Sequence, residues 1–224
     1  WNSILFAIYF EDNESIIIKN SSIKNNSGGS YIKNTSSLSI YNTSYEYNLF
    51  PLYVNNCSDL EISYCTINYN QNAEGDGGGL VCSNSTGKIN NSYINYNTVN
   101  GHSSGGTRKG GGAYLSGSIQ VINCEVKGNK LTTSGAGQGH GGGLLATGGV
   151  IIDSTLISSN EVTISNGVCW SGGGGVYIGG NATIKNSKII NNICNGYGGG
   201  ILVAPYGGVS QANISKSIIF GNIA

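Results

Sequence analysis

The chain of 224 residues has no methionine, only two prolines and two histidines, and a formal net charge of zero. Its single arginine is Arg108, and it contains no run of basic residues. Binding to nucleic acid or to an anionic membrane depends on positive charge, so the composition argues against both partners. No apolar run approaches the roughly 20 residues that span a bilayer. The N-terminus lacks the segments of a signal peptide, and we interpret the chain as a piece of something longer.

An eightfold repeat organises what is present. In each copy an apolar residue is followed five positions later by a second apolar residue and eight positions later by asparagine, with Ser, Thr or Cys at the third step. The copies begin at Ile18, Ile40, Ile62, Ile89, Val121, Ile152, Ile184 and Ile214. Their starts are 22, 22, 27, 32, 31, 32 and 30 residues apart, so the repeat unit lengthens toward the C-terminus.

The repeat predicts the fold. Apolar residues two positions apart indicate strands, and no stretch has helical spacing. A unit of about 22 residues with Gly and Asn at its corners is typical of a parallel β-helix. We therefore predict an all-β, right-handed parallel β-helix of about eight to nine coils with insertion loops along one edge. It is expected to be a single domain over 1–224, with short coils over 10–76 and longer, looped coils over 77–224.

The asparagine that ends each copy is expected at a corner, because Asn tolerates left-handed backbone and can bond its own turn. Stacking of the coils would then align these side chains in a corner ladder. Its members are Asn26, Asn48, Asn70, Asn97, Asn129, Asn160, Asn192 and Asn222.

A glycine run precedes the first strand of each of the last five coils. The runs are 77–79, 110–112, 141–143, 173–175 and 198–200, each followed by an apolar residue. Together with endings such as Ile94-Asn95-Tyr96-Asn97, they resemble the repeats of polymorphic outer-membrane proteins, which pair Gly-Gly-Ala-apolar with Phe-x-x-Asn. The resemblance implies a secreted β-helical adhesin at a cell surface. The family's Phe is replaced here, and no membrane barrel follows, so an anchor or further repeats would lie outside this chain.

The insertions all fall between the corner asparagine and the glycine run, and therefore leave one edge of the rod. This loop edge holds the less common residues His102, Arg108, His140 and Trp170. Function on a rigid scaffold is usually carried by loops, so the loop edge is a candidate contact site. The alternative is a glycine-rich cover over the wall of the helix.

Alternation along the strands predicts a second surface. Val81, Tyr114, Leu145, Tyr177 and Leu202 would point outward and stack as an apolar stripe, either as a contact surface or buried under the adjacent loops. A further stack of Tyr47, Tyr69 and Tyr96 is interpreted as interior packing rather than a sugar platform.

The six cysteines form no metal-binding pattern, and no cofactor or metal is expected. Cys169 with Cys194, and Cys57 with Cys82, lie in similar places of successive coils and are the disulfide candidates. Cys65 and Cys124 are expected to be small buried residues. Ten Asn-x-Ser/Thr sequons favour the secretory route, and five in loops or on outward positions are the glycosylation candidates: Asn34, Asn84, Asn90, Asn181 and Asn213.

Three functions remain open. The first is an extracellular, glycosylated surface or adhesive β-helix that binds a protein or glycan. The second is a segment of a filament or stalk that assembles end to end by coil stacking. The third, a hydrolase or lyase acting on polysaccharides, requires paired carboxylates on neighbouring coils. Glu125 and Asp153 are the best available pair, and we expect the protein not to be an enzyme.

Overall fold

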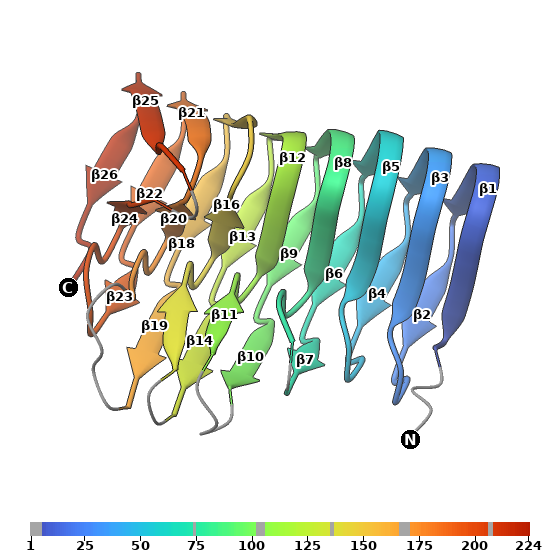
Figure 1. The fold of residues 1–224 in the computed structure, drawn as a ribbon, viewed down its shortest axis with the longest axis horizontal. Coiled ribbons are helices and arrows are strands. Elements are labelled where there is room, and N and C mark those ends of the chain that lie inside the picture. The colour runs from blue at the N-terminus through green and yellow to red at the C-terminus, as the bar shows by residue number, and fades with distance from the viewer. Residues whose placement is uncertain (1–5, 74, 102–105, 135–136, 166–170, 206–207) are drawn as a thin grey trace.

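The structure, a computed structural model, describes residues 6–73, 75–101, 106–134, 137–165, 171–205 and 208–224. Eight coils stack along one axis from the N- to the C-terminus, and every strand pairing between them is parallel (Figure 1). The described residues contain no helix, and hence none long enough to cross a membrane. The predicted parallel β-helix is confirmed.

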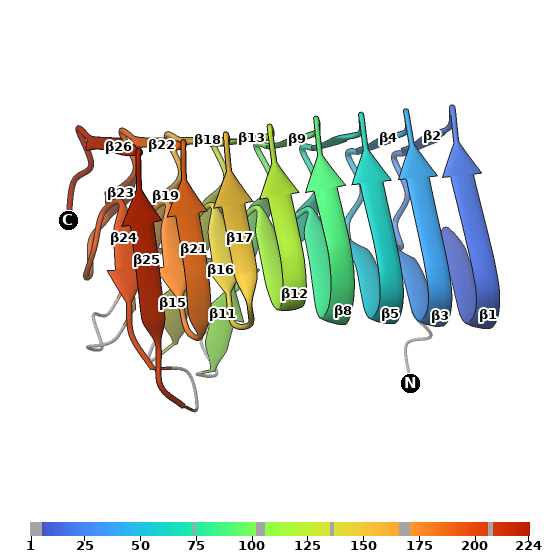
Figure 2. The same cartoon turned by 90° about the horizontal axis from the view of Figure 1, so that it is seen from above.

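The largest sheet forms one face of the rod (Figure 2). Five long strands begin it, and each later coil contributes a pair of shorter strands because a glycine-containing turn interrupts the line at 147–149 and its equivalents. In order, these strands are β1 (Ile8–Lys19), β3 (Ser30–Tyr41), β5 (Leu52–Ser63), β8 (Leu80–Asn90), β12 (Ala113–Ile122), β16 (Leu144–Ala146) with β17 (Val150–Asp153), β20 (Val176–Ile178) with β21 (Asn181–Lys185), and β24 (Ile201–Val203) with β25 (Gln211–Ser215).

A second sheet follows the first around a tight corner, and each coil contributes a strand of three residues. Its strands are β2 (Ser22–Lys24), β4 (Ser44–Glu46), β6 (Thr66–Asn68), β9 (Tyr93–Asn95), β13 (Glu125–Lys127), β18 (Leu156–Ser158), β22 (Lys188–Ile190) and β26 (Ile218–Phe220). The apolar residues that define the repeat point inward from both sheets. They form the main core, in which Ile62, Ile94 and Val126 are fully buried.

The insertions lie along one edge, as predicted, but much of their length forms strands instead of loops (Figure 1). A third sheet consists of β7 (Gln71–Asn72), β10 (Thr98–Gly101), β14 (Lys130–Thr133), β19 (Glu161–Ile164) and β23 (Ile193–Cys194). A two-stranded sheet pairs β11 (Thr107–Lys109) with β15 (Gln138–His140). Val99, Leu131, Val162, Ile164 and Cys194 form a second, smaller core beneath the third sheet.

The corner ladder is present and is hydrogen-bonded along its whole length. The expected left-handed backbone, however, falls on the residue before each ladder asparagine, such as Asn25 or Tyr47, and the prediction of positive φ at the asparagines themselves is wrong. Asn129 shows the pattern: its side-chain oxygen accepts the backbone N–H and the side-chain N–H of Asn97 at 2.9 and 3.0 Å. Its own Nδ2 donates to the Ile94 carbonyl at 2.8 Å and to Asn160 Oδ1 at 2.9 Å. Both Asn97 and Asn129 are fully buried. The ladder therefore satisfies backbone groups at a corner that water does not reach.

The glycine runs pack against this ladder. A Cβ at Gly111 would lie 2.3 Å from the carbonyl oxygen of Gly142, and one at Gly112 would lie 2.8 Å from the Asn129 side chain. Such distances leave no room for a side chain, so glycine is required by the close approach of successive coils.

Candidate functional site

The corner between the first and second sheets carries a column of polar residues, all exposed except the half-buried Asn91. The residue two positions after each repeat start has a positive φ between 47 and 54° in all eight coils. Asn is common in this column because its short amide side chain tolerates left-handed backbone. The column is Asn20, Asn42, Tyr64, Asn91, Asn123, Ser154, Asn186 and Lys216.

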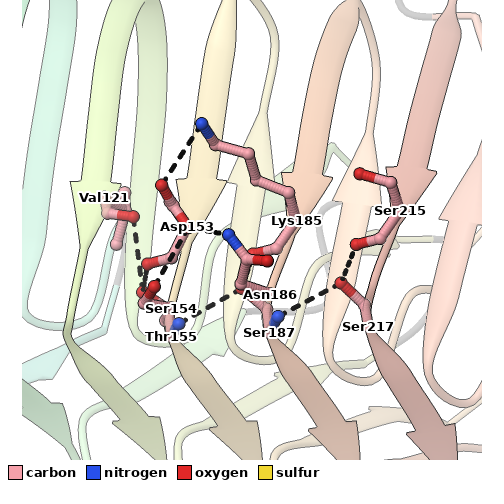
Figure 3. A network of polar contacts seen from close by, with 9 residues as sticks. All are labelled: Val121, Asp153, Ser154, Thr155, Lys185, Asn186, Ser187, Ser215 and Ser217. Atoms are coloured by element: carbon pink, nitrogen blue, oxygen red, sulfur yellow. Dashed lines mark hydrogen bonds and ion pairs between the residues drawn. The ribbon is translucent and has the colours of Figure 1, made fainter.

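The next residue in each coil is small and turns its side chain inward to satisfy the corner. The Ser187 hydroxyl accepts the Thr155 backbone N–H, and the Ser217 hydroxyl accepts that of Ser187, both at 3.1 Å (Figure 3). The Thr155 hydroxyl itself donates to the Asp153 carbonyl at 2.9 Å. This buried hydroxyl ladder holds the exposed column in a fixed position.

A shallow groove runs along this corner over the first six coils, and we call it the corner groove. It has two adjoining parts that share Tyr64 and Thr66, and the larger part has a volume of about 560 Å³. Most of its lining consists of amides and hydroxyls. The lining residues are Asn20, Ser21, Ser22, Asn42, Thr43, Ser44, Tyr64, Thr66, Asn91, Ser92, Tyr93, Asn123, Cys124, Glu125, Ser154 and Leu156.

Two tyrosines lie at the middle of the corner groove. Tyr64 replaces asparagine in the polar column, and its ring is 5.5 Å from that of Tyr41 in an edge-on arrangement. Tyr93 begins β9 in the next coil. Tyr64 and Tyr93 are 56% and 53% exposed. Exposed tyrosines beside amides and hydroxyls combine an apolar surface with hydrogen-bonding groups, as ligand sites for sugars require.

The two carboxylates in and beside the corner groove are held by hydrogen bonds from neighbouring residues. Glu125 accepts a hydrogen bond from Asn95 Nδ2 at 2.7 Å. Asp153 accepts from Asn186 Nδ2 at 2.9 Å and from the Ser154 hydroxyl at 3.0 Å, and pairs with Lys185 at 3.3 Å (Figure 3).

The hydrogen bond from Asn186, with those from Ser154 and Lys185, lowers the pKa of Asp153 below its usual value. Asp153 is therefore ionised at neutral pH and is poorly suited to act as the general acid that glycoside hydrolysis requires. Among the residues that the structure describes, no group of three or more His, Cys, Asp or Glu is arranged to hold a metal ion.

The residues of the predicted apolar stripe pair in register from coil to coil, but the stripe is covered. Tyr114 pairs with Val81 and Leu145, and Tyr177 with Leu145 and Leu202. Val81, Leu145 and Tyr177 are at most 2% exposed, so the prediction of an exposed contact stripe over these coils is wrong. The physical reason is that β11, β15 and the adjoining glycines fold over the stripe, which was the alternative interpretation.

The loop edge is also less open than a contact site would be. His140 is 3% exposed and stacks on the Tyr177 ring with centroids 4.2 Å apart, and Arg108 is half-buried. His102 and Trp170 lie outside the described residues. For His140 the structure corrects the predicted contact role, because its ring is part of the cover over the stripe.

The structure sorts the glycosylation candidates by exposure. Asn84, Asn181 and Asn213 are exposed. Asn34 is half-buried and its Nδ2 donates to Asp12 at 2.8 Å, while Asn90 is half-buried with a buried side-chain oxygen. Of the five candidates, the first three are therefore accessible.

The predicted Cys57–Cys82 disulfide is wrong, because both residues are free and buried. Cys82 pairs in register with Val54, three residues before Cys57, so the two cysteines are not register partners. Cys194 is a free thiol as well, and Cys169 lies outside the described residues. Cys65 and Cys124 are buried small residues, as expected.

The stack of Tyr47, Tyr69 and Tyr96 is not interior packing. Its rings are stacked 5.0 and 5.2 Å apart and are 53, 42 and 42% exposed. The interpretation failed because these tyrosines occupy positive-φ corners, where the side chain points to solvent. The corner groove was not predicted because its column also consists of positive-φ residues. A sequence signal was available, since the position two after each repeat start never carries an aliphatic residue.

These features define a right-handed parallel β-helix with a polar groove on its outer face. The family model described as "right handed beta helix region" matches residues 2–130, and the chain belongs to this family. The family includes both enzymes and proteins that are not enzymes. No curated protein and no solved structure matches the chain significantly.

Proposed function

We propose that this β-helix is a non-catalytic surface or adhesive domain that binds an uncharged glycan chain along the corner groove. The observation that carries the proposal is the pair Tyr64 and Tyr93, exposed in the middle of a groove of amides and hydroxyls. Each coil repeats hydrogen-bonding groups about 4.8 Å further along the rod. A long ligand with its own regular repeat, such as an extended polysaccharide, suits such a surface.

The charge of the corner groove favours a neutral ligand. Among the lining residues Glu125 is the charged one, and it carries a negative charge. An anionic polysaccharide or a nucleic acid would meet this carboxylate with no lysine or arginine in the lining to offset it. The ionised Asp153 is unsuited to the general-acid role in glycoside hydrolysis, which supports the non-catalytic part of the proposal.

An extracellular or cell-surface location belongs to the same proposal. The exposed sequons Asn84, Asn181 and Asn213 support it, as does the resemblance of the glycine and asparagine motifs to those of polymorphic outer-membrane proteins. Intact-mass measurement of material from the native source tests this part: attached sugars support it, and an unmodified mass contradicts it.

An array of neutral and acidic glycans tests the binding. We expect binding to neutral chains that falls at least tenfold, about 1.4 kcal/mol, in the variant Tyr64→Asn. Asn is native at this position in neighbouring coils, so the substitution fits the positive φ. Tyr69→Asn is the matched control, because Tyr69 lies in the same coil with a similar φ of 56° but outside the corner groove. Equal loss in both variants, or preference for acidic chains, would contradict the proposal.

A stalk built by coil stacking is the second candidate. Inward-facing apolar residues of the last described coil are exposed, with Ile214 at 41% and Ile219 at 49%. Phe10 in the first coil is 37% exposed. Such surfaces fit burial against further coils, from the same or another chain. Electron microscopy of native material would show continuous rods if this function is primary and short particles if it is not.

A further inference from the structure

The covered stripe continues toward the N-terminus as a column of tyrosines over which the described part of the chain places no strand. Val81 pairs in register with Tyr53, which pairs with Tyr31, which pairs with Tyr9. The three rings are stacked with centroids 5.0 and 5.6 Å apart and interplanar angles of 12 and 9°. Phe6 adds a fourth ring, 5.3 Å from Tyr31. We call these four residues the aromatic column.

The short repeats explain why none of the described residues forms a covering strand over the aromatic column. Only three residues separate Asn48 from Leu52, the first residue of β5, whereas fifteen separate Asn97 from β12. The first coils therefore lack the residues that could form a covering strand, as Figure 1 shows at the N-terminal end. Tyr9 is 52% and Phe6 39% exposed, and Tyr31 and Tyr53 are half-buried.

The later coils show what kind of segment covers this line of residues. The covering segments are extended and rich in glycine, and they place a basic or imidazole side chain over an aromatic ring. Lys109 of β11 lies 4.9 Å from the centroid of the Tyr114 ring, and His140 of β15 stacks on Tyr177. Gly77 lies directly against Val81, since a Cβ there would be 2.5 Å from Val81 Cγ2.

The cover ends beside the aromatic column. The two-stranded sheet β11–β15 gains no further strand on the N-terminal side in the part of the chain that the structure describes. There the backbone of Gly77 donates to the Lys109 carbonyl at 2.7 Å, and Asp76 pairs with Lys109 at 2.8 Å. The next position along the rod is the surface over Tyr53 and Tyr31.

The first coils carry a net negative charge, which favours a basic segment. Residues 6–63 contain six carboxylates and three lysines. Glu11 lies close to the aromatic column, where it pairs with Lys33 at 2.7 Å and accepts a hydrogen bond from the Tyr9 hydroxyl. The rest of the chain, by contrast, carries eight basic and five acidic residues, and its covering strand β11 contains Arg108 and Lys109.

We propose that the aromatic column is a docking surface for an extended, glycine-rich, basic peptide segment of a partner protein. The segment adds beside Gly77 as the next strand of the cover and lies over Tyr53 and Tyr31. Its backbone extends the cover by strand addition, and its lysine or arginine meets the aromatic rings beside Glu11.

The test uses the described chain and a synthetic peptide with the sequence of residues 106–112, Gly-Thr-Arg-Lys-Gly-Gly-Gly. Tyrosine ring resonances are followed by NMR during titration. We expect saturable shifts for Tyr31 and Tyr53 and none for Tyr69. A charge-reversed peptide, with glutamate in place of arginine and lysine, is expected to bind at least tenfold more weakly.

The variant Tyr53→Val is the second part of the peptide-binding test. Valine is native in the same column at Val81, so the substitution suits the strand, and we expect it to weaken peptide binding at least tenfold. The absence of saturable shifts, equal binding of the charge-reversed peptide, or shifts of the column tyrosines by a neutral oligosaccharide instead would overturn the proposal. The charge-reversal arm uses the unaltered protein and therefore stands whatever the folding of the variant.

Discussion

Replacement of Asn129 by alanine tests the physical basis of the coil stacking. Asn129 lies in the middle of the corner ladder, where its side chain makes four hydrogen bonds. Asn129→Ala would leave the Asn97 backbone N–H, one side-chain hydrogen of Asn97 and the Ile94 carbonyl without these partners. The Asn97 side chain is fully buried, so water can replace the lost contacts only if the corner opens.

The expected cost follows from the number of groups left unpaired. A buried polar group that loses its partner costs about 1 to 3 kcal/mol. Three such groups, each at the lower value, give a loss of about 3 kcal/mol in the free energy of unfolding. This is a large part of the roughly 5 to 15 kcal/mol by which folded domains are stable.

Urea unfolding followed by far-ultraviolet circular dichroism measures this loss. Asn100→Ala is the matched control, because Asn100 is exposed on the neighbouring strand β10 and surface substitutions usually change stability by about 0.5 kcal/mol or less. A difference between the two variants below about 1 kcal/mol would refute the view that the corner ladder stabilises the stacked coils.

Three further predictions concern titratable groups. Burial raises the pKa of Tyr45 to about 12 from a usual 10.0. The neutral phenol therefore stabilises the fold below pH 10.0, and this contribution is lost as the pH rises toward 12. In unfolding measurements, Tyr45→Phe should show a smaller loss of stability at alkaline pH. The hydrogen bond from Asn186 lowers the pKa of Asp153. The ionised carboxylate therefore stabilises the fold above the usual pKa of 3.8, and this contribution is lost as the pH falls through the pKa of the folded state. In thermal unfolding, Asp153→Asn should be destabilised by acid less than the unaltered protein. Burial also raises the pKa of the thiols of Cys57, Cys65, Cys82, Cys124 and Cys194. Mass spectrometry should therefore find these thiols alkylated in urea and largely unmodified in the native protein. Fast alkylation of the native protein would contradict their burial.

Much of the architecture follows from the sequence because the β-helix is built from local repeats. The spacing of Ile62, Ile67 and Asn70 within one coil already places two inward residues and a corner. Their equivalents in the next coil must stack on them, so the corner ladder could be predicted as well. The strands within the insertions could not, since β11 and β15 are stabilised by their position over Tyr114 and Tyr177 more than by any period of their own.

The candidate site was harder to predict because exposure depends on what lies above a residue. Alternation placed Tyr177 and Leu145 outward correctly, but it contains no information on the cover that buries them. The same alternation extends to Tyr31 and Tyr53, where short repeats leave the column open. The corner groove depends on positive-φ residues such as Tyr64, whose side-chain direction departs from simple strand alternation.

A crystal structure of the protein with the neutral oligosaccharide that binds most tightly on the array tests the central claim most directly. The proposed function predicts that the sugar lies along the corner groove, in contact with Tyr64 and Tyr93 and hydrogen-bonded to Asn91 or Asn123. A sugar bound at another surface, with the corner groove open to solvent, would contradict it.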